Sequence, residues 1–179
     1  MKYYIADTHF GHGNVLAFDN RPFSNVEEMD RKMIDIWNKT VGEEDEVYIV
    51  GDFAYRNEHP EEWYLSRLHG RKYLVIGNHD TKLLNNENAM RYFAGVDKMM
   101  HVSDGEHQIC VCHFPLAEWN GFHRGTMHIH GHIHNRHDAT WEFMKTRERA
   151  YNAGCMLHGY RPVTLKELIS ALGESNTPP

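Results

Sequence analysis

Short apolar segments that each end at a potential metal ligand are the feature that most constrains this chain. Continuous apolar and aromatic runs predict buried strands. We expect such strands at residues 2–6, 46–50, 72–76 and 107–112 and in the stretch that begins at 127. The side chains at or just beyond their ends are Asp7, His9, Asp52, Asn78, His113, His132 and His134. Since sites in α/β sheets gather outside the carboxyl ends of strands, we expect these seven side chains to converge.

Helical segments separate the early strands. Residues 24–27 have the S-x-x-E form of a capping box, and apolar residues at helical spacing follow them. Further helices are predicted at 60–68, over a broken stretch at 83–93 and after a second capping box at 164–167, with a weaker strand at 151–155. Strands that alternate with helices early and follow one another more closely later favour an α/β protein with a mixed sheet or two sheets.

Length and composition narrow the class of protein. The 179 residues are 41% hydrophobic, which suits one globular domain over residues 1–173, with a flexible tail at 174–179. No apolar run approaches the ~20 residues of a membrane span, and no signal peptide is visible, so we expect no membrane partner. Three cysteines without C-x-x-C spacing indicate reduced thiols and a cytoplasmic setting. The net charge of −6 disfavours a general nucleic-acid binder.

The seven strand-end residues form an unusual donor set of two carboxylates, one amide oxygen and four imidazoles. The set is too rich in nitrogen for calcium or magnesium and too poor in thiolate for a structural zinc site. Seven ligands suit two ions that share a bridging carboxylate. Two divalent cations and two carboxylates would leave a charge of about +2 for an anion. Metals roughly 3.5–4 Å apart clamp a phosphoryl group and lower the pKa of a bridging water. The residues therefore predict a phosphoester hydrolase with a dinuclear centre and a metal-bound hydroxide as nucleophile.

Five short motifs carry a resemblance to a known family. They are "DTH" at 7–9, "GD" at 51–52, "GNHD" at 77–80, His113 and "GHIH" at 131–134. In this order they resemble the signature blocks of the calcineurin-like metallophosphoesterases, over residues 3 to about 165. The short length and "DTHFGHGN" are similar to the small, capless members from phages and bacteria. The resemblance implies a four-layer αββα sandwich of two mixed sheets flanked by helices.

The resemblance also implies a role for each motif residue. One metal would be held by Asp7, His9 and His134, the other by Asn78, His113 and His132, with Asp52 as the bridge. His79 would contact the phosphate and protonate the leaving group, and Asp80 would orient the His79 ring. Manganese is the metal we expect, with iron, zinc, nickel and cobalt as the other candidates.

For several further residues the sequence is compatible with two roles. His12 and Asn14 either contact the substrate phosphate or cap the loop after the first motif, and Arg21 is either a phosphate clamp or an ordinary loop arginine. The loop at 119–124 either grips a leaving group or packs on the surface. For the alternating histidines His128 and His130 we favour buried hydrogen bonding over direct metal ligation.

The expected function is hydrolysis of a small-molecule phosphomonoester or phosphodiester, nucleotides included. Two alternatives remain. A catalytically weak protein-interaction scaffold predicts eroded ligands, whereas His79 and all seven candidate ligands are present. A nuclease fits the acidic chain less well, because nucleic-acid binders need a basic surface. The sequence leaves the oligomeric state open.

Overall fold

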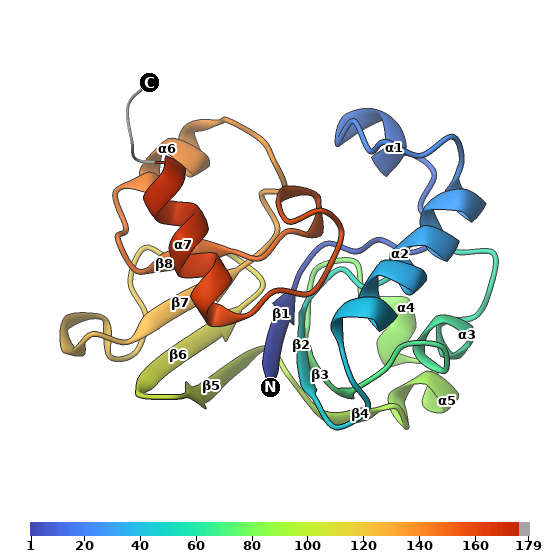
Figure 1. Cartoon of the computed structure of the whole chain (residues 1–179), viewed down its shortest axis with the longest axis horizontal. Helices are drawn as coiled ribbons and strands as arrows, with labels where there is room; N and C mark the ends of the chain where they lie inside the picture. The colour runs from blue at the N-terminus through green and yellow to red at the C-terminus, as the bar shows by residue number, and fades with distance from the viewer. Residues whose placement is uncertain (176–179) are drawn as a thin grey trace.

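The computed structural model describes residues 1–175, with side chains to residue 171, and contains two four-stranded sheets (Figure 1). The first sheet has the order β1 (Lys2–Ile5), β2 (Glu46–Val50), β3 (Arg71–Val75) and β4 (Phe93–Asp97). The second has the order β5 (Met99–Asp104), β6 (His107–Cys112), β7 (Met127–His130) and β8 (Ala150–Asn152).

The prediction of two mixed sheets is wrong for the first sheet. All of its strand pairs are parallel, whereas the second sheet combines one antiparallel pair, β5 with β6, with the parallel pairs β6–β7 and β7–β8. The physical reason lies in the connections. Helical crossovers join the strands of the first sheet and return each strand in the same direction, but only two residues separate β5 from β6, which permits a hairpin.

Helices flank both sheets (Figure 1). Those that follow strands of the first sheet are α1 (Val15–Phe18), α2 (Val26–Thr40), α3 (Glu61–Leu65), α4 (Thr81–Leu84) and α5 (Glu87–Met90). The later part of the chain contributes α6 (Ala139–Lys145), α7 (Leu165–Ser175) and the short 3₁₀ helices η1 (Phe122–Arg124) and η2 (Cys155–Leu157). Within the described residues, no helix has both the length and the apolar character needed to cross a bilayer.

Of the two predicted capping boxes, one forms as predicted and the other is shifted by one residue. At α2 the cap is one residue later than predicted: the Asn25 side chain accepts from the Glu28 N–H, and the Glu28 carboxylate accepts from the Ser24 N–H. Before α7 the predicted box forms, with Thr164 and Glu167 exchanging hydrogen bonds. The first two residues of the tail expected at 174–179 belong to α7, and residues 176–179 lie outside the described residues.

Strands β4 and β5 were not predicted from the sequence. Each is an edge strand, and most of their side chains are only half-buried or exposed. A strand that buries neither face fully needs no continuous apolar run, so residues 93–104 carry no clear strand pattern.

Three clusters of buried side chains fix the layers. Helix α2 packs Met29, Met33 and Trp37 against the outer face of the first sheet. The inner faces of the two sheets meet in a second cluster, in which Val50 and Val75 face Ile129. The outer face of the second sheet carries a smaller cluster of Cys110, Trp119, Met144 and Ala150. The two sheets therefore pack face to face with helices outside them, and the carboxyl ends of the central strands open on one edge.

Candidate metal centre

All seven predicted ligands lie at this carboxyl edge. Asp7 and His9 follow β1, and Asp52 and Asn78 lie two and three residues beyond β2 and β3. The second sheet contributes the other three, His113 directly after β6 and His132 and His134 just beyond β7. Strands β1, β2 and β3 run parallel to one another, and so do β6 and β7, so the ligand-bearing ends lie together within each sheet. Contacts of His113 with Asn78 and Asp52 bring the ends of the two sheets to a single place.

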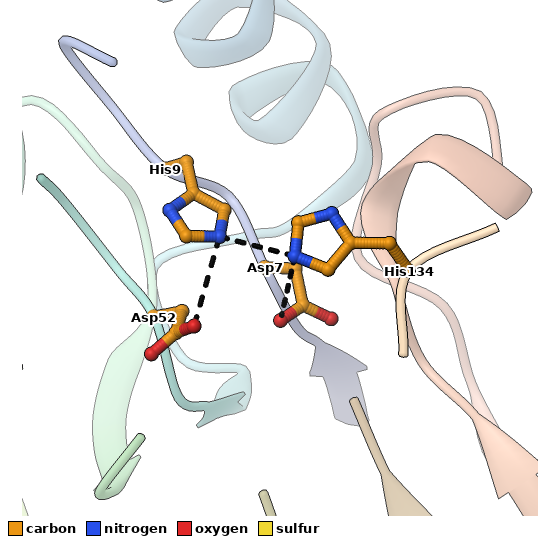
Figure 2. Close-up of side chains that lie close together, drawn as sticks. All are labelled: Asp7, His9, Asp52 and His134. Carbon is orange, nitrogen blue, oxygen red and sulfur yellow. Dashed lines mark hydrogen bonds and ion pairs between the residues drawn. The ribbon is translucent and has the colours of Figure 1, made fainter. Parts of the chain in front are cut away.

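Asp7, His9, Asp52 and His134 form a first donor group (Figure 2). One ligand atom from each lies within 4.8 Å of all the others. His9 Nε2 is 3.3 Å from His134 Nε2 and 3.7 Å from Asp52 Oδ2, and His134 Nε2 is 3.7 Å from Asp7 Oδ1. Three members are buried and His134 is partly exposed, so the group opens to solvent on one side only.

Asn78, His113 and His132 form a second donor group beside the first. Asn78 Oδ1 lies 3.1 Å from His113 Nε2 and 2.9 Å from His132 Nδ1. His113 Nε2 is in turn 3.5 Å from Asp52 Oδ2. The same carboxylate oxygen of Asp52 therefore lies between an imidazole of each group.

Hydrogen-bond acceptors outside the two groups set the tautomers of two ligand histidines. The Asp19 carboxylate accepts from His134 Nδ1, at 2.8 and 3.0 Å, and the Val50 carbonyl accepts from His113 Nδ1 at 2.9 Å. We assign the ring protons to Nδ1 on the basis of these acceptors. Both Nε2 atoms then point lone pairs into the site, which is how metal-binding histidines are usually held.

Burial perturbs the ionisable groups of the site. It raises the pKa of Asp7 to about 6 and lowers the pKa of His9 well below its usual value. For His134 burial alone would lower the pKa, but the bond with Asp19 and the charges of Asp7 and Asp19 raise it instead. Burial would raise the pKa of Asp19, yet His134 and Arg21 together lower it. Buried acids and lone pairs that face one another are costly without a compensating cation.

Backbone strain is concentrated at the same edge. Eight non-glycine residues of the described chain have positive φ. Five of them are candidate ligands: Asp7, His9, Asp52, His132 and His134, with φ between 49° and 69°. Such conformations cost roughly 1–3 kcal/mol each and persist where the surroundings impose them, most often at functional sites.

Two glycines permit the close approach of the ligand loops. A Cβ at Gly131 would lie 2.7 Å from Asp7 Oδ2, and a Cβ at Gly77 would collide with Asp52. A side chain at either position would therefore collide with the segment that carries Asp7 or Asp52.

His79 lies at the rim of the site, as the sequence predicts, but Asp80 does not orient it. The His79 ring lies 4.4 Å from Tyr55 and 5.6 Å from His9, and its backbone N–H donates to Asp52 Oδ1. The Asp80 carboxylate accepts instead from the backbone N–H groups of Asp52, Phe53 and Gly77. Asp80 therefore fixes the loops that carry Asp52 and Asn78, and its predicted role was wrong.

The phosphate-clamp interpretation of Arg21 is also wrong. Its side chain is fully enclosed and donates to the carbonyl oxygens of Asp7 and Thr8, at 2.8 Å each, and to Asp19. These hydrogen bonds fix the backbone of the segment that follows β1. A guanidinium enclosed in this way cannot contact a substrate.

His12 and Asn14 lie beside the site in different environments. His12 is buried, 5.5 Å from the His9 ring and 4.9 Å from Tyr55, and its Nδ1 has no hydrogen-bond partner among the described residues. Asn14 is exposed before α1, and its side chain forms no cap bond. The structure thus places His12, but not Asn14, against a ligand imidazole.

The alternating histidines before Gly131 are hydrogen-bonded parts of the second sheet, as favoured from the sequence. His128 Nδ1 donates to the Cys110 carbonyl and its Nε2 accepts from the Leu116 N–H, while His130 Nδ1 bonds the Gly131 carbonyl. Burial lowers the pKa of His128 to about 4 and that of His130 to about 3, so both are neutral at pH 7. In the loop at 119–124, Trp119 is buried and donates to the Thr126 carbonyl, which is a packing role.

A cavity of about 370 Å³ opens over both donor groups. It is lined by Phe18, Asp19, Asp52, Asn78, His79, His132, His134 and Arg136. Phe18, Asp19 and Arg136 were not predicted as site residues from the sequence. No motif or spacing could have found them, because only the fold brings them to the ligands.

Comparisons with known proteins place the chain among relatives. No family model matches it. "Uncharacterized protein MJ1445" from Methanocaldococcus jannaschii is 30% identical over 172 residues, which cover 95% of this chain and 90% of that protein. The chain belongs to the family of that protein. The "Gene 66 protein" of Mycobacterium phages D29 and L5 is 27% identical in each case, over 75% and 74% of this chain and 78% and 77% of the phage proteins.

One solved structure has the same fold as this chain. It is the crystal structure of the protein of unknown function AQ665 from Aquifex aeolicus, with a TM-score of 0.73 and 24% sequence identity. The match covers 95% of this chain and 98% of the Aquifex protein. The two chains therefore have the same overall architecture.

Proposed function

We propose that this chain is a calcineurin-like metallophosphoesterase that hydrolyses a phosphoester at a centre of two divalent metal ions. One observation carries the proposal: two carboxylates and two imidazole Nε2 atoms converge within 4.8 Å at a largely buried point. A buried cluster of acids and lone pairs requires positive charge at its centre. The motif order and the packing of helices, sheet, sheet and helices support the finer fold assignment.

The donor groups fit two ions. Asp7, His9, His134 and Asp52 would hold the first, and Asn78, His113, His132 and Asp52 the second. Oxygen and imidazole donors in this mixture suit manganese, and also iron, cobalt, nickel and zinc. When bound, such a pair of ions supplies a clamp for a phosphoryl group and lowers the pKa of a water between them.

The chain's own residues then orient the substrate and supply a proton. The backbone N–H of His79 is anchored on Asp52, while its ring packs on His9 and Tyr55 and accepts or donates no hydrogen bond among the described residues, so a ring nitrogen can protonate a leaving oxygen. Arg136 lines the same cavity and forms an exposed ion pair with Asp138 at 3.7 Å, so its guanidinium can turn to an anionic substrate at little cost. Together these groups favour hydrolysis over the scaffold alternative, because an interaction module has no need for a complete donor set on a strained backbone.

Metal analysis combined with a phosphoester panel tests the proposal. We expect the purified protein to retain up to two divalent ions per chain and to hydrolyse p-nitrophenyl phosphate or its bis-ester when manganese is added. Chelation should abolish turnover, and manganese should restore it. Failure to bind metal, or absence of turnover of every ester by metal-loaded protein, would contradict the proposal.

A variant at His79 separates proton transfer from metal binding. We expect His79→Ala to keep its metal but to lose roughly 10²- to 10⁴-fold in kcat. His107→Ala is the matched control, because His107 is exposed at the start of β6. Equal kcat values for the two variants would remove His79 from the mechanism.

A further inference from the structure

Two exposed phenylalanines border the metal centre. Phe18 is 57% exposed and Phe114 is 44% exposed. Among the described residues, Phe143 is the other phenylalanine with such exposure, and it lies on α6. Exposed phenyl rings that gather at a cavity rather than scatter over the surface indicate a binding surface.

The two rings stand beside different donor groups. Phe18 ends α1 and lies 6.2 Å from the His134 ring of the first group. Phe114 directly follows a ligand and lies 4.6 Å from His132 and 5.1 Å from His113, both of the second group. A phosphate held by both donor groups would therefore lie between Phe18, beside the first group, and Phe114, beside the second.

A purely structural role explains these rings poorly. A packing role would be to hold the ligand imidazoles, but His134 and His113 are already fixed by hydrogen bonds to Asp19 and the Val50 carbonyl. Packing also does not require about half of each phenyl surface to face solvent. Open aromatic faces of this kind can instead stack on planar rings of a ligand.

Positive charge accompanies the aromatic surface. Arg136 lines the cavity that Phe18 borders. Arg56 lies 5.3 Å from the ring of Tyr55, which in turn packs on His79. The rim of the site therefore combines planar apolar faces with guanidinium groups, which suits a ligand that combines planar rings with phosphate.

We propose that the substrate is a small nucleotide-type phosphodiester whose planar groups stack on Phe18 and Phe114, one on each side of the phosphate. This inference rests on the proposed function and narrows its substrate class. The overall charge of −6 favours a small diester over a long polyanion, because a nucleic-acid strand needs an extended basic track.

Two esters with the same chromogenic leaving group test the proposal in metal-loaded protein. They are thymidine 5′-(p-nitrophenyl phosphate) and methyl p-nitrophenyl phosphate, which differ only in the second substituent. We expect kcat/KM to be about tenfold higher for the thymidine ester, mainly through a lower KM, since base stacking is worth roughly that factor. A ratio near one in the unmodified protein would overturn the inference, and absence of turnover of both esters would overturn the proposed function instead.

The double variant Phe18→Leu/Phe114→Leu assigns the preference to the two rings. We expect its kcat/KM ratio to fall towards one while its metal content stays unchanged. Phe143→Leu is the matched control and should keep the ratio. A double variant that retains both metal and ratio would overturn the assignment.

Inhibition of the unmodified protein provides a measurement that no folding defect can disturb. Thymidine 5′-monophosphate should compete at about tenfold lower concentration than methyl phosphate, and equal inhibition would contradict stacking. A thymidine oligonucleotide of ten residues should compete no better than a thymidine dinucleotide. Affinity that grows with length would overturn the small-substrate proposal in favour of a nucleic-acid strand.

Discussion

The two sheets contribute different chemistry to the candidate metal centre. Loops after strands of the first sheet supply every oxygen donor, Asp7, Asp52 and Asn78, together with the imidazole of His9. The second sheet supplies imidazoles alone, from His113, His132 and His134. All negative charge of the donor set therefore comes from the first sheet.

The first half of the chain also orients the imidazoles of the second half. The Val50 carbonyl, Asp19 and the Asn78 side chain contact His113, His134 and His132 respectively. The same contacts therefore join the two halves of the chain across the site. This difference suggests that substitutions which remove charge or orientation from the first half will weaken the site most.

The largest effect is expected at Asp52. Asp52→Asn removes the charge next to both donor groups while its amide oxygen can still accept from the His79 N–H. We expect metal affinity and activity to fall by more than the roughly 10- to 100-fold that loss of a supporting residue costs. The loss should also exceed that of His132→Asn, which removes no negative charge from the site. Metal titration and ester turnover measure both. Equal losses in the two variants would contradict the larger contribution that we assign to the first sheet.

An intermediate effect is expected at Asp19, which lies outside the donor groups. Asp19→Asn weakens the acceptor for His134 Nδ1 and the ion pair with Arg21, so His134 is held less firmly. We expect metal affinity to fall about 10- to 100-fold, as for other residues that support metal ligands. The control is Asp35→Asn on the exposed face of α2. If metal titration gave the same affinity for both variants, Asp19 would not be needed to orient the His134 imidazole.

The last effect concerns stability instead of metal binding and is expected at Asp30, whose bonds lie wholly within the first half. Its carboxylate accepts from the Gly11 N–H and the Tyr64 hydroxyl, and burial raises its pKa from 3.8 to about 6. Between these values the folded protein keeps a proton that the unfolded chain releases, so stability falls as the pH rises through this window and is level above it.

We therefore expect the free energy of unfolding of the unmodified protein, relative to Asp30→Asn, to decrease by roughly 1–3 kcal/mol from pH 4 to pH 7. Urea unfolding in chelator measures it without a contribution from bound metal. Parallel pH profiles for the two proteins would exclude Asp30 as the source of the pH dependence.

Local pattern was enough to predict the strands with mostly buried side chains, the edge strands β1 and β8 included, but not the more exposed edge strands β4 and β5. The runs that became β1, β2, β3 and β6 are apolar because the structure buries both faces over much of each strand, at residues 3–5, 47–50, 74–75 and 109–112. Strands β4 and β5 lie at sheet edges and escaped notice. The capping box of α2 was predicted at Ser24, one residue before the observed cap at Asn25. Both residue types are good helix caps, and tertiary packing determines which of them begins the helix.

The sequence by itself determined where the buried strands run and which potential ligands follow them, because both depend on residues that are neighbours along the chain. Tertiary structure decided what Asp80 and Arg21 do, which group orients His134, and how Phe18 and Phe114 border the site. Those outcomes depend on contacts between distant segments and on loss of water from buried charges. Neither is encoded in the local spacing of residues.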